Sequence, residues 1–416
     1  MQMKKHFLTT LLFLVGFSTL VAQDFSVDAN FRTRSEYRHG QGRLFQKEEK
    51  PAFFVNQRAR LGTSYQNEWL ELRLTAQQIF TWGDAQQPQA ELKNHLGFFE
   101  AWAKMQIDED WNVKLGRQVI SYDDERILGG LDWSQYGRFH DAVVVSYKNF
   151  LNVGLAFNQE GQSNVGNAYA IGNTSKNTYK TMQFLRANKK WQDNSLSFLF
   201  INNGFQDFDS SGKQDGVSNM QTTGFYGIFP ISSLMLEASA YYQFGKFQKT
   251  SVSAYQLRAE LIYKTQEFTA GLGMEMLSGR DYDDTSAKIK SFNPLYGTAH
   301  KFNGHMDFYY LGQNLQGTTG LNDIYAKAIV KFNEKSNLLF MPHIFMSNAK
   351  RADNKSYLGT ELDFMFTQQF RKYVALNVGY SHHLPSDAIK VATTHGMQNW
   401  FWVQLNIKPT LFTTKQ

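Results

Sequence analysis

The chain has 416 residues, of which 15 % are aromatic and 19 % charged, and its formal net charge is +6 at pH 7. This charge is small for such a length and no run of clustered Lys or Arg appears, so nucleic-acid binding is excluded. Because the sequence has no cysteine, disulfides, thiolate metal sites and a lipid anchor on cysteine are excluded as well.

The first 22 residues have the layout of a secretory signal peptide. Two lysines precede an apolar run over residues 7–21, and the small residue Ala22 ends the segment. We expect cleavage after Ala22, which leaves residues 23–416 as a single domain. Beyond this run, no apolar stretch reaches the roughly 18 residues that a membrane helix requires.

Residues 26–38 (SVDANFRTRSEYR) begin the mature chain with a strict alternation of two kinds of side chain. Arg32, Arg34 and Arg38 share one side, whereas Phe31 and Tyr37 belong to the other. A period of two residues predicts a β-strand with one charged and one apolar face.

The same alternation returns along the chain, as in residues 53–66, 69–80, 234–244, 253–264 and 358–366. These segments are roughly 10–13 residues long and carry aromatic side chains near their ends, as expected for strands that cross a bilayer between aromatic girdles. A water-soluble sandwich would also alternate, but with shorter strands.

Short and long connections alternate between the predicted strands. Eight are short turns, at residues 65–69, 106–112, 147–152, 188–195, 229–234, 263–268, 331–337 and 367–373. Nine are longer polar loops, at residues 39–51, 83–96, 121–138, 159–177, 203–218, 245–251, 278–320, 348–356 and 382–398. Seventeen connections give eighteen strands. A further candidate strand at residues 305–311 would make the number odd and separate the termini, so we assign residues 291–310 to a structured loop.

The predicted fold class is therefore all-β: a transmembrane antiparallel β-barrel of about 18 strands, porin-like, with short periplasmic turns and long outer loops. It would lie in the outer membrane of a Gram-negative bacterium, in contact with outer-membrane lipid. A barrel of this width cannot be filled by its wall side chains and should hold a water-lined channel or one partly obstructed by loops.

Charged side chains on the predicted inner faces are the candidate pore lining. They are Arg32, Arg34, Arg58, Arg60, Arg73, Lys104 and Arg258, with the acids Glu71, Glu100, Glu361 and Asp363. Rings of Arg or Lys favour anions, and the arginine fork suits carboxylates, phosphates and sulfates. Alternatively, acids and bases neutralise one another in cross-strand pairs.

The segment from Gly116 to Val143 resembles the alginate-export family of outer-membrane proteins. The residues that carry the resemblance are Gly116, Arg117, Gln118, Asp123, Asp124, Arg126, Gly129, Asp132, Trp133 and Asp141. Residues 294–310 and 358–364 look like further parts of the same family pattern. The resemblance implies a single barrel of eighteen strands that passes a polyanionic uronate through an arginine-rich constriction.

Carried over to this chain, the resemblance makes Arg117 and Arg126 candidates for the constriction. Alternation, however, puts Arg117 on the same side as Val113 and Leu115, which faces lipid unless a bulge intervenes.

Two other groups of residues suggest different chemistry. The acidic residues Asp281, Asp283 and Asp284 could bind calcium, or could form a solvated loop. His140 beside Asp141, and His305 near Asp307, could serve a hydrolase, but no serine elbow or metal-ligand spacing accompanies them. We expect no enzyme activity and no cofactor.

We therefore expect a monomeric outer-membrane channel for anionic solutes, namely acidic oligo- or polysaccharides of the alginate type, with an arginine-rich pore. The alternative is a non-conducting barrel that binds a surface partner or glycan through its long outer loops.

Overall fold

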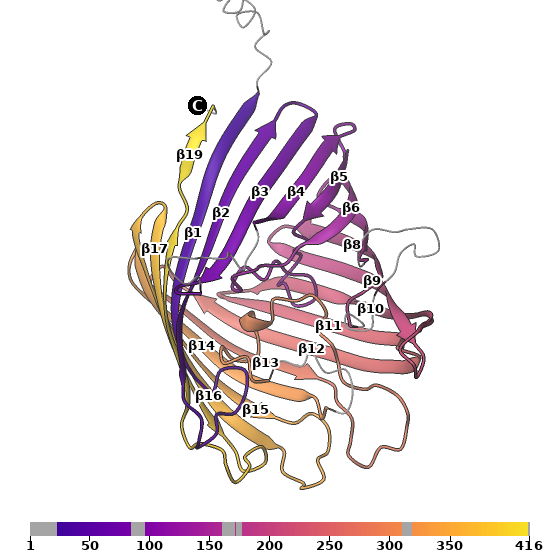
Figure 1. Ribbon diagram of the computed structural model, residues 1–416, viewed down its shortest axis with the longest axis vertical. Helices are drawn as coiled ribbons and strands as arrows, with labels where there is room; N and C mark the ends of the chain where they lie inside the picture. The colour runs from indigo at the N-terminus through magenta and orange to yellow at the C-terminus, as the bar shows by residue number, and fades with distance from the viewer. Residues whose placement is uncertain (1–22, 85–95, 160–170, 172–176, 310–317, 415–416) are drawn as a thin grey trace, which may run out of the picture.

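The computed structural model describes residues 23–84, 96–159, 171, 177–309 and 318–414. Its strands form one sheet, in which paired strands are antiparallel. β1 (Asp24–His39) pairs with β2 on one side and with β18 and β19 on the other, so the sheet closes into a barrel (Figure 1).

The wall is built almost entirely of strands, which are 4–18 residues long. They are β2 (Ala52–Gln66), β3 (Leu70–Thr81), β4 (Gly97–Gln106), β5 (Trp111–Gln118), β6 (His140–Tyr147), β7 (Leu151–Phe157), β8 (Thr181–Trp191), β9 (Asn194–Phe208), β10 (Gln214–Ile231), β11 (Leu234–Phe247), β12 (Thr250–Lys264), β13 (Phe268–Leu277), β14 (Leu321–Asn333), β15 (Ser336–Met346), β16 (Tyr357–Arg371), β17 (Val374–Pro385), β18 (Gln398–Ile407) and β19 (Thr410–Thr413). A short 3-10 turn, η2 (Ala299–Lys301), lies in the loop before β14. Within the described ranges, no helix has the length and apolar character needed to cross a membrane.

β18 and β19 are two parts of one strand, because both pair with β1. Lys408 and Pro409 interrupt it; proline has no N–H to donate to a ladder, and the register against β1 shifts nearby, between Val27 and Asp28. The nineteen segments therefore occupy eighteen positions. The expected porin-like, eighteen-stranded, antiparallel barrel is confirmed.

Burial on β1 follows the alternation in the sequence. Phe31 and Tyr37 are 39 % and 36 % exposed, whereas Arg32 and Arg34 are each 4 % exposed. The arginines therefore point into the barrel and the aromatic side chains point outward to lipid.

All eight short turns lie between the expected strands. Two of the nine loops, however, are much shorter than expected: β9 continues to Phe208 before β10 starts at Gln214, and β11 continues to Phe247 before β12 starts at Thr250. Gln248 and Lys249 join β11 to β12 with positive φ angles of 45° and 68°. Such a turn usually contains Gly or Asn, so the sequence carried no signal for it.

Residues 119–139 and 291–309 fold inward and form what we call the plug (Figure 1). The first segment reaches the wall at β2, β8 and β13, which lie on different sides of the barrel. The two segments are joined by backbone hydrogen bonds, including 2.9 Å from Gly129 N to Tyr296 O. The expectation of a structured loop holds for residues 291–309, and Tyr310 lies outside the described residues.

The plug packs through an apolar core against one side of the wall. Its Leu128 and Phe292 are buried together with Phe184 of β8 and Ile201 of β9. The core extends from β6 to β16 and leaves the polar inner face of β1–β5 outside it. The interior is therefore divided into a packed apolar half and a polar half.

Candidate functional site

Four arginines form a ladder on the inner face of the polar half. Arg32 and Arg34 come from β1, and Arg58 and Arg60 come from β2, with Arg32 directly opposite Arg58. Like charges directly opposite each other in a sheet destabilise it unless a counter-charge is present.

Asp132 of the plug supplies this counter-charge. Its carboxylate lies 2.9 Å from Arg32 Nη2, 2.9 Å from Arg58 Nη1 and 3.4 Å from Arg60 Nη1. Burial alone would raise the pKa of Asp132, but Arg32, Arg58, Lys408 and Arg60 lower it to about 2. The Asp132 side chain stays 55 % exposed, whereas Arg58 is fully buried.

Trp133 holds Arg34, the fourth arginine of the ladder. The Arg34 guanidinium lies 3.8 Å from the centre of the Trp133 ring and donates to the Trp133 carbonyl oxygen. His300 of the plug stacks on the same ring at 4.1 Å. Two adjacent residues of one loop, Asp132 and Trp133, thus hold the whole ladder.

Two further arginines are held by carboxylates deep in the barrel. Arg126 of the plug donates to Glu275 of β13 at 2.7 and 2.9 Å, and both side chains are 1 % exposed. Arg258 of β12 lies 3.3 Å from Asp124 of the plug and also contacts Glu260. These pairs tie the plug to the far wall.

Glu361 and Asp363 also hold the plug. Glu361 accepts a hydrogen bond of 2.7 Å from the backbone N–H of Met306, and Asp363 accepts one of 3.1 Å from that of His305. Burial lowers the pKa of His305 to about 4, although Asp363 opposes this shift. Both carboxylates are fully buried and do not line an open path.

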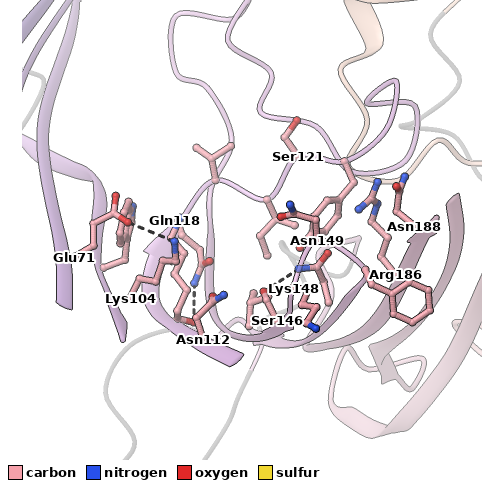
Figure 2. Close-up of a pocket in the computed structure, with 18 of the residues that line it drawn as sticks. Glu71, Lys104, Asn112, Gln118, Ser121, Ser146, Lys148, Asn149, Arg186 and Asn188 are labelled. Carbon is pink, nitrogen blue, oxygen red and sulfur yellow. Dashed lines mark hydrogen bonds and ion pairs between the residues drawn. The ribbon is translucent and has the colours of Figure 1, made fainter. Parts of the chain in front are cut away.

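Two cavities lie inside the barrel, one beside the ladder and one nearer the short turns. One, of 510 Å³, is lined by Arg34, Arg38 and Trp133 and by the outer ends of β1–β3. The other, of 1240 Å³, is lined by β3–β6 and β8, the β6–β7 turn and the plug residues Ser121 and Tyr122 (Figure 2). Because short turns face the periplasm in outer-membrane barrels, we call this second cavity the periplasmic vestibule.

A family model described as alginate export matches residues 23–403. The chain belongs to the alginate-export family. Comparison with curated proteins gave no match.

Solved structures with the same fold are outer-membrane proteins. OccAB4 of Acinetobacter baumannii has a TM-score of 0.62 at 10 % identity, covering 94 % of this chain and 100 % of that chain. OccK9 of Pseudomonas aeruginosa has a TM-score of 0.64 at 11 % identity, with 93 % and 98 % covered. OpdK of Pseudomonas aeruginosa, solved with vanillate, has a TM-score of 0.61 at 9 % identity, with 94 % and 100 % covered. Family and fold together indicate an outer-membrane channel of Gram-negative bacteria.

Arg117 differs from its expected place in the constriction of this alginate-export protein. It donates to Asp141 at 2.8 and 2.9 Å, and its guanidinium lies 4.4 Å from the Phe139 ring centre. Its neighbours on the same face, Leu115 and Val143, are 39 % and 45 % exposed. No bulge separates Arg117 from them, so the alternation of β5 places it on the outer wall.

The remaining predicted lumen residues lie on the inner faces of β3 and β4. Arg73 is paired with Asp28, and Lys104 lies 3.6 Å from Glu71. Glu100 accepts a hydrogen bond of 3.1 Å from Trp102.

The acidic loop residues pair with cations. Asp281 accepts a hydrogen bond from the backbone of Lys350, Asp283 lies 2.9 Å from Lys350 Nζ, and Asp284 lies 2.8 Å from Lys290. Among the residues that the structure describes, no group of three or more His, Asp or Glu side chains has an arrangement that could hold a metal ion.

In both His–Asp pairs proposed from the sequence, the two side chains contact other partners and not each other. His140 is buried and contacts Tyr179 OH at 2.8 Å, while Asp141 points to the outer wall. His305 contacts Asp363, and Asp307 contacts His300. Neither pair has the geometry of a base with its orienting carboxylate.

The counter-ion role of Asp132 was not recognised in the sequence. Asp132 and Trp133 belong to the motif Gly-Gly-Leu-Asp-Trp at residues 129–133, but alternation reports only on strands. The sequence did offer one signal for this role. The loop contains glycine, a carboxylate and an aromatic side chain, and the predicted strand arginines had no assigned partner.

Proposed function

We propose that this channel passes anionic solutes, namely acidic oligo- or polysaccharides, along the arginine ladder. The observation that carries the proposal is the convergence of Arg32, Arg58 and Arg60 on one half-exposed carboxylate, that of Asp132. A carboxylate of the solute is the same chemical group as the Asp132 side chain. The ladder is thus built to hold such a group.

A solute can pass along the ladder only if its carboxylate exchanges with that of Asp132. A solute carboxylate takes the place of Asp132 on the guanidinium groups, and Asp132 returns when the solute moves on. Conduction requires binding that is favourable enough for entry and weak enough for release. The resident carboxylate meets this requirement, because it lowers the net gain of binding without removing the donors.

The alternative of a surface-binding barrel receives less support. Its long loops would have to project outward to meet a partner, whereas residues 119–139 and 291–309 of this chain are packed inside the barrel. Catalysis has no assembled site to support it among the His–Asp pairs described above.

Planar-bilayer recording tests the proposal. The variant Arg32→Gln/Arg58→Gln should lower the chloride-to-potassium permeability ratio several-fold, because Asp132 then loses two of its cations and the positive charge of the ladder falls by two. The control Arg43→Gln/Arg351→Gln removes the same charge from loop residues that have no contact with Asp132 and should keep the wild-type ratio. Heat-modifiable migration on gels verifies folding. An unchanged ratio in the folded ladder variant would refute the proposal.

A further inference from the structure

The periplasmic vestibule is a large, open and strongly cationic space, separate from the ladder. Its wall side chains come from β3–β8, and plug residues 119–122 also line it (Figure 2). The cations that line it are Lys104, Lys114, Lys148, Arg186, Lys189 and Lys190, against a single lining carboxylate, Glu71.

Three of these cations already have partners. Lys104 lies 3.6 Å from Glu71, Lys148 lies 3.2 Å from Asp110, and Arg186 lies 2.7 Å from Asp123.

Lys114 and Lys190 differ from these three. In the described part of the chain, neither has a carboxylate within 4.0 Å, and the same holds for the exposed Lys189. Lys114 instead lies 3.8 Å from the centre of the Trp102 ring, which offers attraction but no counter-charge. Lys114 and Lys190 therefore lack a direct ion-pair partner, whereas three of the ladder arginines share the carboxylate of Asp132.

A cleft lined by one sign of charge between low-dielectric walls concentrates ions of the opposite sign. The vestibule also presents neutral donors and acceptors, among them Asn112, Gln118, Asn149 and Asn152. Amides at this density beside ammonium groups suit a ligand that carries both hydroxyls and negative charge. The volume of the vestibule, 1240 Å³, exceeds what a single small anion needs.

We propose that the periplasmic vestibule is a second binding site for saccharides with carboxylate groups, with Lys114 and Lys190 as the residues that bind the anionic groups. The site rests on the proposed function for its substrate class, but not on the ladder for its affinity. A solute held here is already inside the barrel when it meets Asp132.

Isothermal titration calorimetry of the full chain in detergent tests the site, with hexagalacturonate as probe and maltohexaose as the neutral probe. The wild type should bind hexagalacturonate and not maltohexaose. Lys114→Gln/Lys190→Gln should weaken binding at least about tenfold, since hydrogen bonds to charged groups are among the stronger ones. The control Lys264→Gln/Lys335→Gln removes two lysines that do not line the vestibule and should bind as the wild type does.

A second readout guards against an effect of folding. Because Lys114 lies against Trp102, hexagalacturonate should change the tryptophan fluorescence of the wild type, and Trp102→Phe should reduce that change while binding persists. The ladder variant Arg32→Gln/Arg58→Gln should retain hexagalacturonate binding even if it loses anion selectivity, or if the ladder proves not to select anions. Equal affinity in folded Lys114→Gln/Lys190→Gln, equal binding of maltohexaose, or loss of binding in the ladder variant would overturn the proposal.

Discussion

Arginines of the same chemical type have two different roles in this barrel. Arg126 faces Glu275 in a pair of which both members are 1 % exposed, so the charge is fixed in place. Arg58 is equally buried, but its partner Asp132 is 55 % exposed and belongs to a loop. Only the second kind of partner can be exchanged for a solute, because water and ions reach it.

The acidity of Asp132 gives a pH prediction. Its pKa falls from 3.8 to about 2 in the folded protein, so the ion pairs are fully present above pH 4 and are lost as the pH falls through about 2. Anion selectivity should therefore rise with a midpoint near pH 2, because protonated Asp132 leaves the guanidinium groups without a counter-charge. Reversal potentials measured between pH 7 and pH 2 provide the check.

Asp132→Asn is the control for this titration. It should show the raised selectivity already at pH 7 and lack the component with a midpoint near pH 2. A wild-type midpoint near 4, the value for an ordinary aspartate, would contradict the described cluster.

Strands and loops differ in how far the sequence specifies them. The strands follow from alternation because each residue faces either lipid or the interior, and polar inner faces such as that of β1 make the period visible. β8 and β9 are less clear, since Phe184 and Ile201 point inward to the plug and are 2 % and 0 % exposed. The inward course of residues 119–139 has no periodic signature, because it depends on contacts with distant strands.

The Arg126–Glu275 pair should act as the main latch between the plug and β13. Arg126→Met would leave Glu275 buried without its cation, and breaking a buried pair in this way costs about 3–5 kcal/mol. The plug should then open far more often. Because the chain has no cysteine, Ser291→Cys, a buried plug position, gives a clean measure of opening by its rate of thiol labelling. We expect the rate to rise roughly a hundredfold or more.

The matched control removes both charges. Arg126→Met/Glu275→Leu in the Ser291→Cys background leaves no uncompensated carboxylate and should label at close to the original rate. If the single and double variants label alike, the pair does not hold the plug.

The barrel as a whole has two chemically distinct halves. From β6 to β16 the inner wall contributes to the apolar core of the plug, while β1–β5 present arginines, lysines and amides. The apolar core of the plug thus packs on one side, the ladder and the smaller cavity lie on the other, and the periplasmic vestibule reaches both, since β6 and β8 also line it. This division explains how a channel can keep a folded plug and still offer a polar route.

The direction of this route depends on which end of the barrel faces the cell. Short turns and the described ends of the chain, at residues 23 and 414, lie at one end, which we assign to the periplasm (Figure 1). Ser210→Cys in the β9–β10 loop and Asp193→Cys in the β8–β9 turn are exposed positions at opposite ends. In intact cells a maleimide on a polymer too large for the pore should modify only Ser210→Cys, and after disruption of the outer membrane it should modify both. Labelling of Asp193→Cys alone in intact cells would invert the barrel and place the cationic vestibule, with its uncompensated Lys114 and Lys190, on the outside.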